Sequence, residues 1–375
     1  MQNYDLTYIT TDSIQEGVGS SQIIPLLKIL SEAQLKVSLI SYEKKAPPTK
    51  LIDELSHQGI NWQIKDFKAS SILDPFKRYR ELMNSIPKSQ VIHGRSDIPT
   101  LAGINSKIAP VLWDVRSLWA DQRKFIEENR LRKTAASVFR LVEARSATGA
   151  AGLSTLTKRV VPILDERYPN LTQIREVIPT CTDLNLFIPR TYKGSSIQGL
   201  YSGTYNNFYD LELSKRFIDV LRSLAPLSIT WARPEESSHS KLDGGEDSII
   251  SVSQNYMAGL IPNFDFGISI CKSNAGVSLA AAVPTKIGEF LACGVPVVVN
   301  RGLGDCDDYI EQRGVGVVLN EVDTIESQAL KFMALLTDSE TAKRCRAVAE
   351  EFFDIRKGAE KYLSLYDRIL QGTVN

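Results

Sequence analysis

Short β-branched runs alternate with amphipathic helical stretches along nearly the whole chain. This alternation is typical of strand and helix units built on a parallel sheet. In the first half, the pattern predicts its longest helix over residues 122–146 and strands at 4–9, 37–42, 60–64, 91–93, 111–115, 149–154 and 176–178. From Thr324 onward it predicts helix, after a second series of strands at 197–202, 227–231, 248–252, 266–270, 295–300 and 316–319.

The segment between the two series, residues 178–189, reads IPTCTDLNLFIP and lacks helical periodicity. Prolines stand near both of its ends, which favours a linker. A chain of 375 residues has the length of two domains. We expect an α/β protein of two Rossmann-like, doubly wound domains facing a cleft, with C-terminal helices. The expected parts are an N-terminal domain at 1–180, a linker at 181–190, a second domain at 191–354, and a C-terminal helix at 355–375 that packs back on the first domain.

The composition is that of an ordinary globular protein, with 43% hydrophobic and 23% charged residues. It excludes collagen-like, disordered and disulfide-dense chains. Lys and Arg total 44 and so do Asp and Glu, and this balance argues against a general nucleic-acid binder. The five cysteines form no CxxC pair, and we see neither a spanning segment nor a secretory signal. These features predict a cytoplasmic protein.

A loop with two glycines, DSIQEGVGSSQ, separates the first predicted strand from a helix that starts near Ser20. Gly17 and Gly19 would let the backbone approach a ligand closely, and the helix N-terminus favours an anion. A simple turn is the alternative. A dinucleotide fingerprint needs a further glycine at position 22, which is Gln22, although Glu43 resembles the ribose-binding acid of that fold.

The segment VPTKIGEFLACGVPVVVN, residues 283–300, predicts a helix followed by a buried parallel strand. Pro284 suits the first helical turn, and Gly294 suits the C-terminal end. Lys286 and Glu289 stand three residues apart and therefore share one face near the helix start. Such a pair is able to bind a nucleotide diphosphate, with Lys at the phosphates and Glu at the ribose hydroxyls. The alternative is a surface ion pair worth a few tenths of a kcal/mol, about 0.2–0.5.

The motif Pro-Thr-Lys-x-x-Glu-Phe-Leu-Ala-x-Gly-x-Pro-Val-Val resembles the donor-site signature of family 4 ("group 1") glycosyltransferases of GT-B fold. Other segments, spread from residue 4 to about 320, resemble further parts of that family: GVGSSQ, VIHGRSD (91–97), WDVRSLWAD (113–121), IPTCTDLNLF, LYSGTYNNFYD and RGLGDCDDYIEQRGVGVVL.

The resemblance implies roles for individual residues. Lys286 would hold the diphosphate and Glu289 the ribose, with His93 and Arg116 as further catalytic residues. Arg95 and Asp114 would lie on the acceptor side. The remaining donor-binding residues would be Gly17, Gly19, Ser20, Gly203, Thr204, Tyr205, Ser253, Pro284 and Thr285. A buried structural role for His93 and a local Asp114–Arg116 ion pair are the alternatives.

Two departures from the family pattern stand out. Many members have a second glutamate eight residues before the one at Glu289, where this chain has Ala281. Many also carry Arg and Lys in the first donor-domain loop, which here reads GTYNNFYDLEL and has neither. Lys286, with Arg116 or Arg95, would have to supply that positive charge.

The resemblance implies retaining transfer of a sugar from a nucleotide-sugar donor to an acceptor, expected to be a lipid-linked or surface-polysaccharide intermediate. No cofactor and no metal are expected, and the acidic cluster of Asp305, Asp307 and Asp308 is interpreted as a solvated loop. The alternatives are a nucleotide-sugar epimerase of the same fold and a non-catalytic nucleotide-sugar-binding protein.

The zero net charge conceals two oppositely charged halves. Residues 1–190 hold 26 basic and 20 acidic residues, and residues 191–375 hold 18 and 24. The basic half includes PFKRYR (75–80) and RLRK (130–133). A basic residue near an anionic membrane is worth about 1 kcal/mol, so peripheral contact with the inner face of the plasma membrane is one interpretation. Ordinary solvated helix faces are the other.

Overall fold

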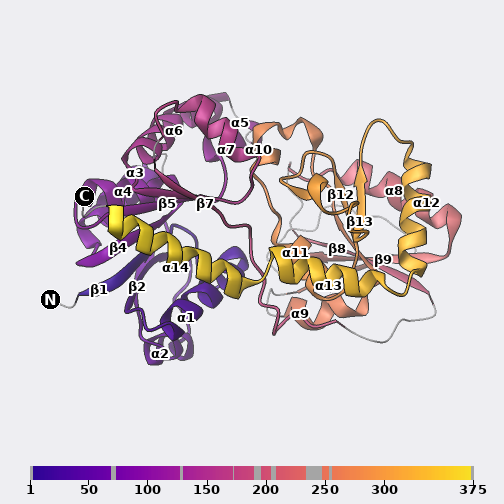
Figure 1. The fold of residues 1–375 in the computed structure, drawn as a ribbon, viewed down its shortest axis with the longest axis horizontal. Helices are drawn as coiled ribbons and strands as arrows, with labels where there is room; N and C mark the ends of the chain where they lie inside the picture. The colour runs from indigo at the N-terminus through magenta and orange to yellow at the C-terminus, as the bar shows by residue number, and fades with distance from the viewer. Residues whose placement is uncertain are drawn as a thin grey trace. The chain divides into compact units, whose positions relative to one another are not determined.

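The computed structural model describes residues 3–68, 73–126, 130–171, 173–189, 196–203, 208–233, 247–252 and 256–372, without the side chains of 126 and 130–137. The chain divides into two compact units (Figure 1). The first unit comprises residues 1–179 together with 355–375, and the second comprises residues 180–354.

A seven-stranded parallel sheet in the order β3-β2-β1-β4-β5-β6-β7 forms the centre of the first unit. Its strands are β1 (Tyr4–Ile9), β2 (Val37–Glu43), β3 (Ile60–Asp66), β4 (Ser89–Arg95), β5 (Val111–Val115), β6 (Gly152–Thr155) and β7 (Ile174–Val177). β2 and β5 are buried along their whole length, as expected for parallel strands covered on both faces. The helices between them are α1 (Ile24–Glu32), α2 (Thr49–His57), α3 (Asp74–Ser85), α4 (Asp97–Ser106), α5 (Trp119–Ile126), α6 (Arg130–Gly149) and α7 (Val160–Arg167).

The second unit has a six-stranded parallel sheet in the order β10-β9-β8-β11-β12-β13. Its strands are β8 (Ile197–Ser202), β9 (Leu227–Arg233), β10 (Ser248–Ser251), β11 (Phe266–Ser269), β12 (Val297–Asn300) and β13 (Gly316–Leu319). Its helices are α8 (Leu211–Leu224), α9 (Met257–Leu260), α10 (Val277–Ala280), α11 (Thr285–Ala292), α12 (Ile325–Thr337) and α13 (Thr341–Phe352). Phe217, Phe266 and Phe332 meet edge-on or tilted in the core between the sheet, α8 and α12.

The C-terminal helix α14 (Ile355–Gly372) belongs to the first unit, where it packs against α1, β4 and β7 (Figure 1, yellow). Its buried face includes Tyr362, Leu365, Tyr366 and Ile369. The face is periodic along the helix, which explains why so polar a sequence buries a helix this long.

Two elements differ from the sequence predictions. The single helix expected over 122–146 is two helices, α5 and α6, and residues 127–129 lie outside the described part. The expected linker is folded onto the second unit: the Arg346 guanidinium donates to the carbonyl oxygens of Leu184 and Phe187. The Thr182 N–H donates to the Phe353 carbonyl oxygen at 2.6 Å. A guanidinium with several donors satisfies backbone carbonyls that irregular chain leaves open.

Within the described residues, no helix is both long and apolar enough to cross a bilayer.

Candidate functional site

Helix α11 presents the Lys286–Glu289 pair within the second unit. The helix begins at Thr285, so Pro284 is the N-cap residue and lies one position before the first helical turn predicted for it. Every residue from Lys286 to Ala292 is buried. Lys286 is only 7% exposed and Glu289 only 3%, so the pair is not a solvated surface ion pair. Burying two opposite charges on one short helix requires specific partners.

The Lys286 ammonium lies at the carboxyl end of β8. Its Nζ donates to the Ser202 carbonyl oxygen at 2.5 Å. A Cβ at Gly203, whose φ is +127°, would stand 3.2 Å from the same Nζ, so glycine leaves the room that the ammonium uses. Burial lowers the pKa of Lys286 to about 8, although Cys271 and Glu289 act in the opposite direction. The structure thus brings together Gly203 and Lys286, two of the residues predicted for the donor site.

Three expected donor-site residues fall outside this description. Thr204 and Tyr205 lie in residues 204–207, and Ser253 lies in residues 253–255.

The loop after β1 has two different uses for its glycines. Gly17 has a φ of +54° and no atom near its missing side chain. A Cβ on Gly19 would stand 1.8 Å from the Ser13 carbonyl oxygen, so the loop backbone itself occupies the space beside Gly19. The Ser20 hydroxyl donates to the Gly17 carbonyl oxygen at 3.0 Å. The residues Gly19–Ile23 form a short π-helical turn that leads into α1.

Glu43, at the end of β2, anchors this loop through its side chain. Its buried carboxylate accepts hydrogen bonds from the hydroxyls of Ser13 and Ser41, both at 2.5 Å, from the Ile14 N–H at 3.0 Å and from the Gln15 side-chain amide at 2.9 Å. These four donors occupy the carboxylate. The resemblance of Glu43 to a ribose-binding acid is therefore explained by a structural role.

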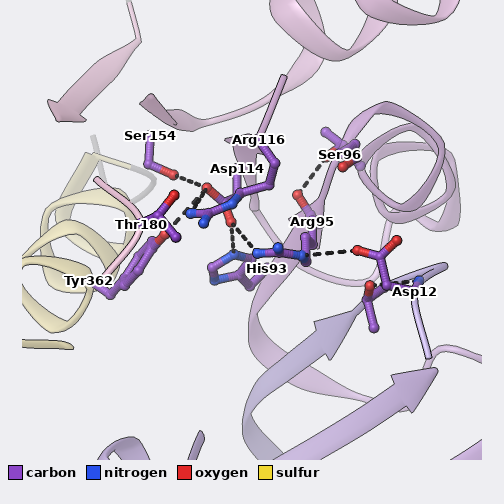
Figure 2. A network of polar contacts seen from close by, with 12 residues as sticks. Asp12, His93, Arg95, Ser96, Asp114, Arg116, Ser154, Thr180 and Tyr362 are labelled. Carbon is purple, nitrogen blue, oxygen red and sulfur yellow. Dashed lines mark hydrogen bonds and ion pairs between the residues drawn. The ribbon is translucent and has the colours of Figure 1, made fainter. Parts of the chain in front are cut away.

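Asp114 is the centre of a polar network at the carboxyl ends of β4 and β5 (Figure 2). Its Oδ1 accepts hydrogen bonds from Ser154 Oγ at 2.9 Å and from Tyr362 OH at 3.2 Å. Arg116 Nη1 lies 3.7 Å from Oδ1, and Arg95 Nη1 lies 3.8 Å from Oδ2. Burial on its own would raise the pKa of the Asp114 carboxyl, but Arg116, His93 and Arg95 hold it well below its usual range.

Arg95 connects this network to the loop after β1. Its Nε donates to Asp12 Oδ2 at 3.2 Å, and the Asp12 N–H donates to the Thr10 hydroxyl at 3.0 Å. Arg95 is buried, whereas the Asp12 side chain is half-exposed. The acceptor-side residues expected from the sequence thus lie in one cluster, and that cluster reaches the glycine loop.

His93 has no exposed surface. Its Nε2 lies 3.2 Å from Asp114 Oδ2, its Nδ1 lies 2.7 Å from Tyr366 OH, and the Tyr8 ring is 4.3 Å away, centroid to centroid. Burial lowers the pKa of His93, and the hydrogen bond and charge of Asp114 act in the opposite direction. This environment matches the structural alternative for His93: it orients Asp114 and joins α14 to the sheet.

The acidic cluster near residue 305 is part of a turn. The Asp307 carboxylate accepts from the Gly302 N–H at 3.0 and 3.2 Å, and Cys306–Asp308 form a 3₁₀ turn. Among the residues that the structure describes, no group of three His, Cys, Asp or Glu side chains is arranged to hold a metal ion.

Several residues of these clusters had no sequence signal of their own. They are Ser154, Tyr362 and Tyr366, whereas Asp12 stands out only as part of the glycine loop. Strand order brings Ser154 to Asp114, because β6 pairs with β5, and the packing of α14 brings the two tyrosines.

No protein-family model matches the chain, and no curated protein sequence matches it. Solved structures resemble it over its full length. Sucrose-phosphate synthase from Thermosynechococcus elongatus has a TM-score of 0.73 at 13% identity, covering 99% of this chain and 100% of that one. A glycosyltransferase from Rickettsia africae has a TM-score of 0.69 at 14% identity, covering 99% of both chains. HepE of Anabaena, in complex with UDP, has a TM-score of 0.67 at 11% identity, covering 97% and 100%.

The chain has the GT-B fold. Its two Rossmann-like units, each a parallel sheet with flanking helices, confirm the predicted fold class. GT-B proteins at these identities share the fold, and function depends on the residues that each places at its sheet ends.

Proposed function

We propose that this GT-B protein is a retaining glycosyltransferase that transfers a sugar from a nucleotide-sugar donor to an acceptor. The observation that supports this most directly is the buried Lys286 ammonium, which lies beside the glycine backbone at the end of β8 and one helical turn from Glu289. A cation beside glycine backbone is suited to bind a diphosphate, and a nearby carboxylate is suited to accept hydrogen bonds from ribose hydroxyls.

The chemical demand of the reaction is negative charge on the departing diphosphate. In our proposal Lys286, together with N–H groups at the start of α11, stabilises that charge as the glycosidic bond to the donor breaks. A preorganised donor of this kind is typically worth about 3–4 kcal/mol in the transition state. The proposal includes metal independence, since Lys286 would supply the charge that a metal ion would otherwise supply.

Uridine nucleotides are the first donors to test. HepE is described in complex with UDP and with UDP-glucose, and a trehalose-6-phosphate protein of E. coli is described with UDP-2-fluoro glucose. These descriptions concern those proteins and support the choice of probe for this one.

In the same proposal the first unit receives the acceptor, with Arg95, Arg116 and Asp114 on the acceptor side. We propose a glycan or lipid-linked acceptor and peripheral contact with the inner face of the plasma membrane. Support comes from the start of α3, where Leu73, the residue before the helix, and Phe76 are both 60% exposed beside the solvent-exposed Lys77. Exposed apolar side chains among basic ones are typical of surfaces that meet anionic lipid.

The experiment is a panel of nucleotide sugars, first by thermal shift and then by product analysis. Stabilisation by one nucleotide class, followed by sugar transfer to an acceptor or slow hydrolysis of the donor, supports the proposal. Conversion of the donor alone into its epimer would identify an epimerase instead. Tight donor binding without any turnover, across acceptors and pH, would identify a binding protein.

A further inference from the structure

Two tyrosine rings also contact the Lys286 ammonium. Nζ lies 4.1 Å from the centroid of the Tyr209 ring and 5.0 Å from that of Tyr201. The two rings are 6.4 Å apart at an interplanar angle of 76°. Both distances fall within the range over which an aromatic face attracts a cation.

The Tyr209 backbone is held by the residues that follow β11. Tyr209 forms an isolated antiparallel bridge with Cys271, and the neighbouring N–H groups of Asp210 and Lys272 donate to Ile270 and Phe208 carbonyls at 3.0 and 2.9 Å. The Cys271 N–H in turn donates to Asn300 Oδ1 at 2.7 Å. Backbone hydrogen bonds therefore position the residue that carries the ring.

The two tyrosine rings offset part of the free-energy cost of removing the Lys286 charge from water. An ammonium that is buried against one carbonyl oxygen loses most of its hydration, and a neutral amine becomes the easier state. An electron-rich ring face favours the charged form without offering a competing anion. A carboxylate in the same place would instead neutralise the cation and repel a phosphate.

We propose that Tyr209 is a positioning residue for Lys286: its ring keeps the ammonium charged and fixed at the carboxyl end of β8, ready for an anionic ligand. The inference rests on the proposed function for the identity of that ligand, a nucleotide diphosphate. It accounts for a sequence departure as well. The loop GTYNNFYDLEL has no basic residue, and Tyr209 lies in this stretch and acts on the one cation that α11 supplies.

The test compares Tyr209→Phe, which keeps the ring, with Tyr209→Leu, which removes it. Lys286 reactivity toward acetic anhydride is followed by peptide mass spectrometry across pH 6–10 in the absence of any nucleotide. We expect the leucine variant to shift the Lys286 labelling profile to lower pH and to weaken UDP binding, measured by calorimetry at pH 8, by about three- to tenfold. The phenylalanine variant should match the parent protein within about twofold.

Tyr256→Leu is the matched control, because Tyr256 is a 70% exposed tyrosine in the same unit and should change neither measurement. Fluorinated phenylalanines at position 209 keep the ring's shape while weakening its negative face, so they test the same contact even if the leucine variant does not fold. The Lys286 profile should then move stepwise with fluorination. An unchanged Lys286 profile across the folded series overturns the inference.

The labelling experiment needs no donor and so separates the two proposals. If the Lys286 labelling profile changes with the ring at position 209 but the protein transfers no sugar, the positioning role stands and the proposed glycosyltransferase function is wrong. If the protein transfers sugar but the labelling profile is the same in all position-209 variants, the proposed function stands and the positioning role of Tyr209 is wrong.

Discussion

Charged side chains in the interior of this protein are each held by several weak partners. Asp114 has two hydroxyl donors and two guanidinium neighbours, and Lys286 has one carbonyl oxygen and two aromatic faces. In both cases several partners share the stabilisation of one buried charge. Substituting one buried charged residue should therefore change activity or stability measurably.

Replacing Lys286 by Ala should lower turnover by about 10²-fold or more, because a preorganised cation for the leaving diphosphate is lost. Since burial lowers the pKa of Lys286 to about 8, donor affinity of the parent protein should also fall as pH rises through that value. Steady-state kinetics and calorimetry measure both effects. Lys343→Ala, at an exposed position of α13, is the control. Near-normal turnover of Lys286→Ala would remove this residue from the mechanism.

Asp97, at the start of α4, makes stability depend on pH in the opposite sense to most carboxylates. Burial, with Glu143 nearby, raises its pKa to about 8, and Trp113 Nε1 donates to its Oδ1 at 3.1 Å. The folded state keeps this proton while the unfolded chain releases it, so this contribution to stability is lost as pH rises from about 4 to 8.

Asp97→Asn should remove that loss, because the amide keeps the acceptor for Trp113 and carries no charge. We expect the denaturant midpoint of the variant to exceed that of the parent at pH 8 and to approach it near pH 4. The slope at stake is at most about 1.4 kcal/mol per pH unit. Equal midpoints at both pH values would show that Asp97 ionises normally.

At the scale of elements, the loop after β1 is a preformed structure rather than a free segment. The Glu43 carboxylate accepts hydrogen bonds from the Ser13 hydroxyl and the Ile14 N–H of the loop, and the Ser13 backbone fills the space beside Gly19. Of the two glycines, only Gly17 has no atom within 4 Å of the position that a Cβ would occupy. A ligand that approaches the loop therefore meets a fixed backbone on that side.

Glu43→Gln should destabilise the first unit by about 1–3 kcal/mol, because one acceptor oxygen becomes an N–H₂ group facing hydroxyl and amide donors. Denaturant unfolding measures the change, and faster proteolysis within residues 11–18 would locate it. Glu54→Gln on α2, which affects a solvent-accessible ion pair with Lys28 of α1, should change stability by less than about 0.5 kcal/mol. Equal effects of the two substitutions would contradict the role of Glu43 in the loop.

The strands were predictable where hydrophobic runs end sharply. The predicted bounds of β1, β5, β8 and β13 are confirmed residue for residue. β6 begins three residues later than expected because α6 continues through Gly149. The site was predictable only in part: motif residues such as Lys286 and Asp114 carried a signal. Their partners did not, since Tyr366 lies 273 residues from His93 and a tyrosine has no pattern that reveals such a contact.

At the scale of the whole molecule, each unit has its own core, and α14 completes the first. Ile369 of α14 is buried and packs so closely over Gly152 that a Cβ there would come within 2.7 Å of it. Two cores permit two unfolding transitions, so stability has to be assigned unit by unit.

Ile369→Ala should destabilise the first unit by about 2–4 kcal/mol through loss of burial and a residual cavity. Calorimetry should show the transition of the first unit at lower temperature, with that of the second unit unchanged. Leu330→Ala on α12, where the side chain is 58% exposed, serves as the control and should leave both transitions nearly in place. A shift of both transitions together would mean that the units unfold as one.

Contact with anionic membrane should depend on the exposed apolar residues next to α3. We expect the protein to sediment with vesicles of anionic phospholipid at low salt, and less so as salt screens the basic residues. The double substitution Leu73→Ser with Phe76→Ser should weaken this binding by several fold, while Val322→Ser, at an 83% exposed position of the second unit, should not. No sedimentation of the parent protein at low salt would favour ordinary solvated helix faces.

The return of α14 to the first unit has a consequence for synthesis on the ribosome. Residues 180–354 form a continuous stretch, whereas the first unit needs residues 355–372 as well. Until residues 355–372 emerge, the nascent chain therefore carries a first sheet that α14 does not yet cover, with His93 and Ile174 lacking their α14 contacts. Domains usually fold in order from the N-terminus. Here the second unit is able to finish first, and α14, which follows it along the chain, completes the unit that was begun first.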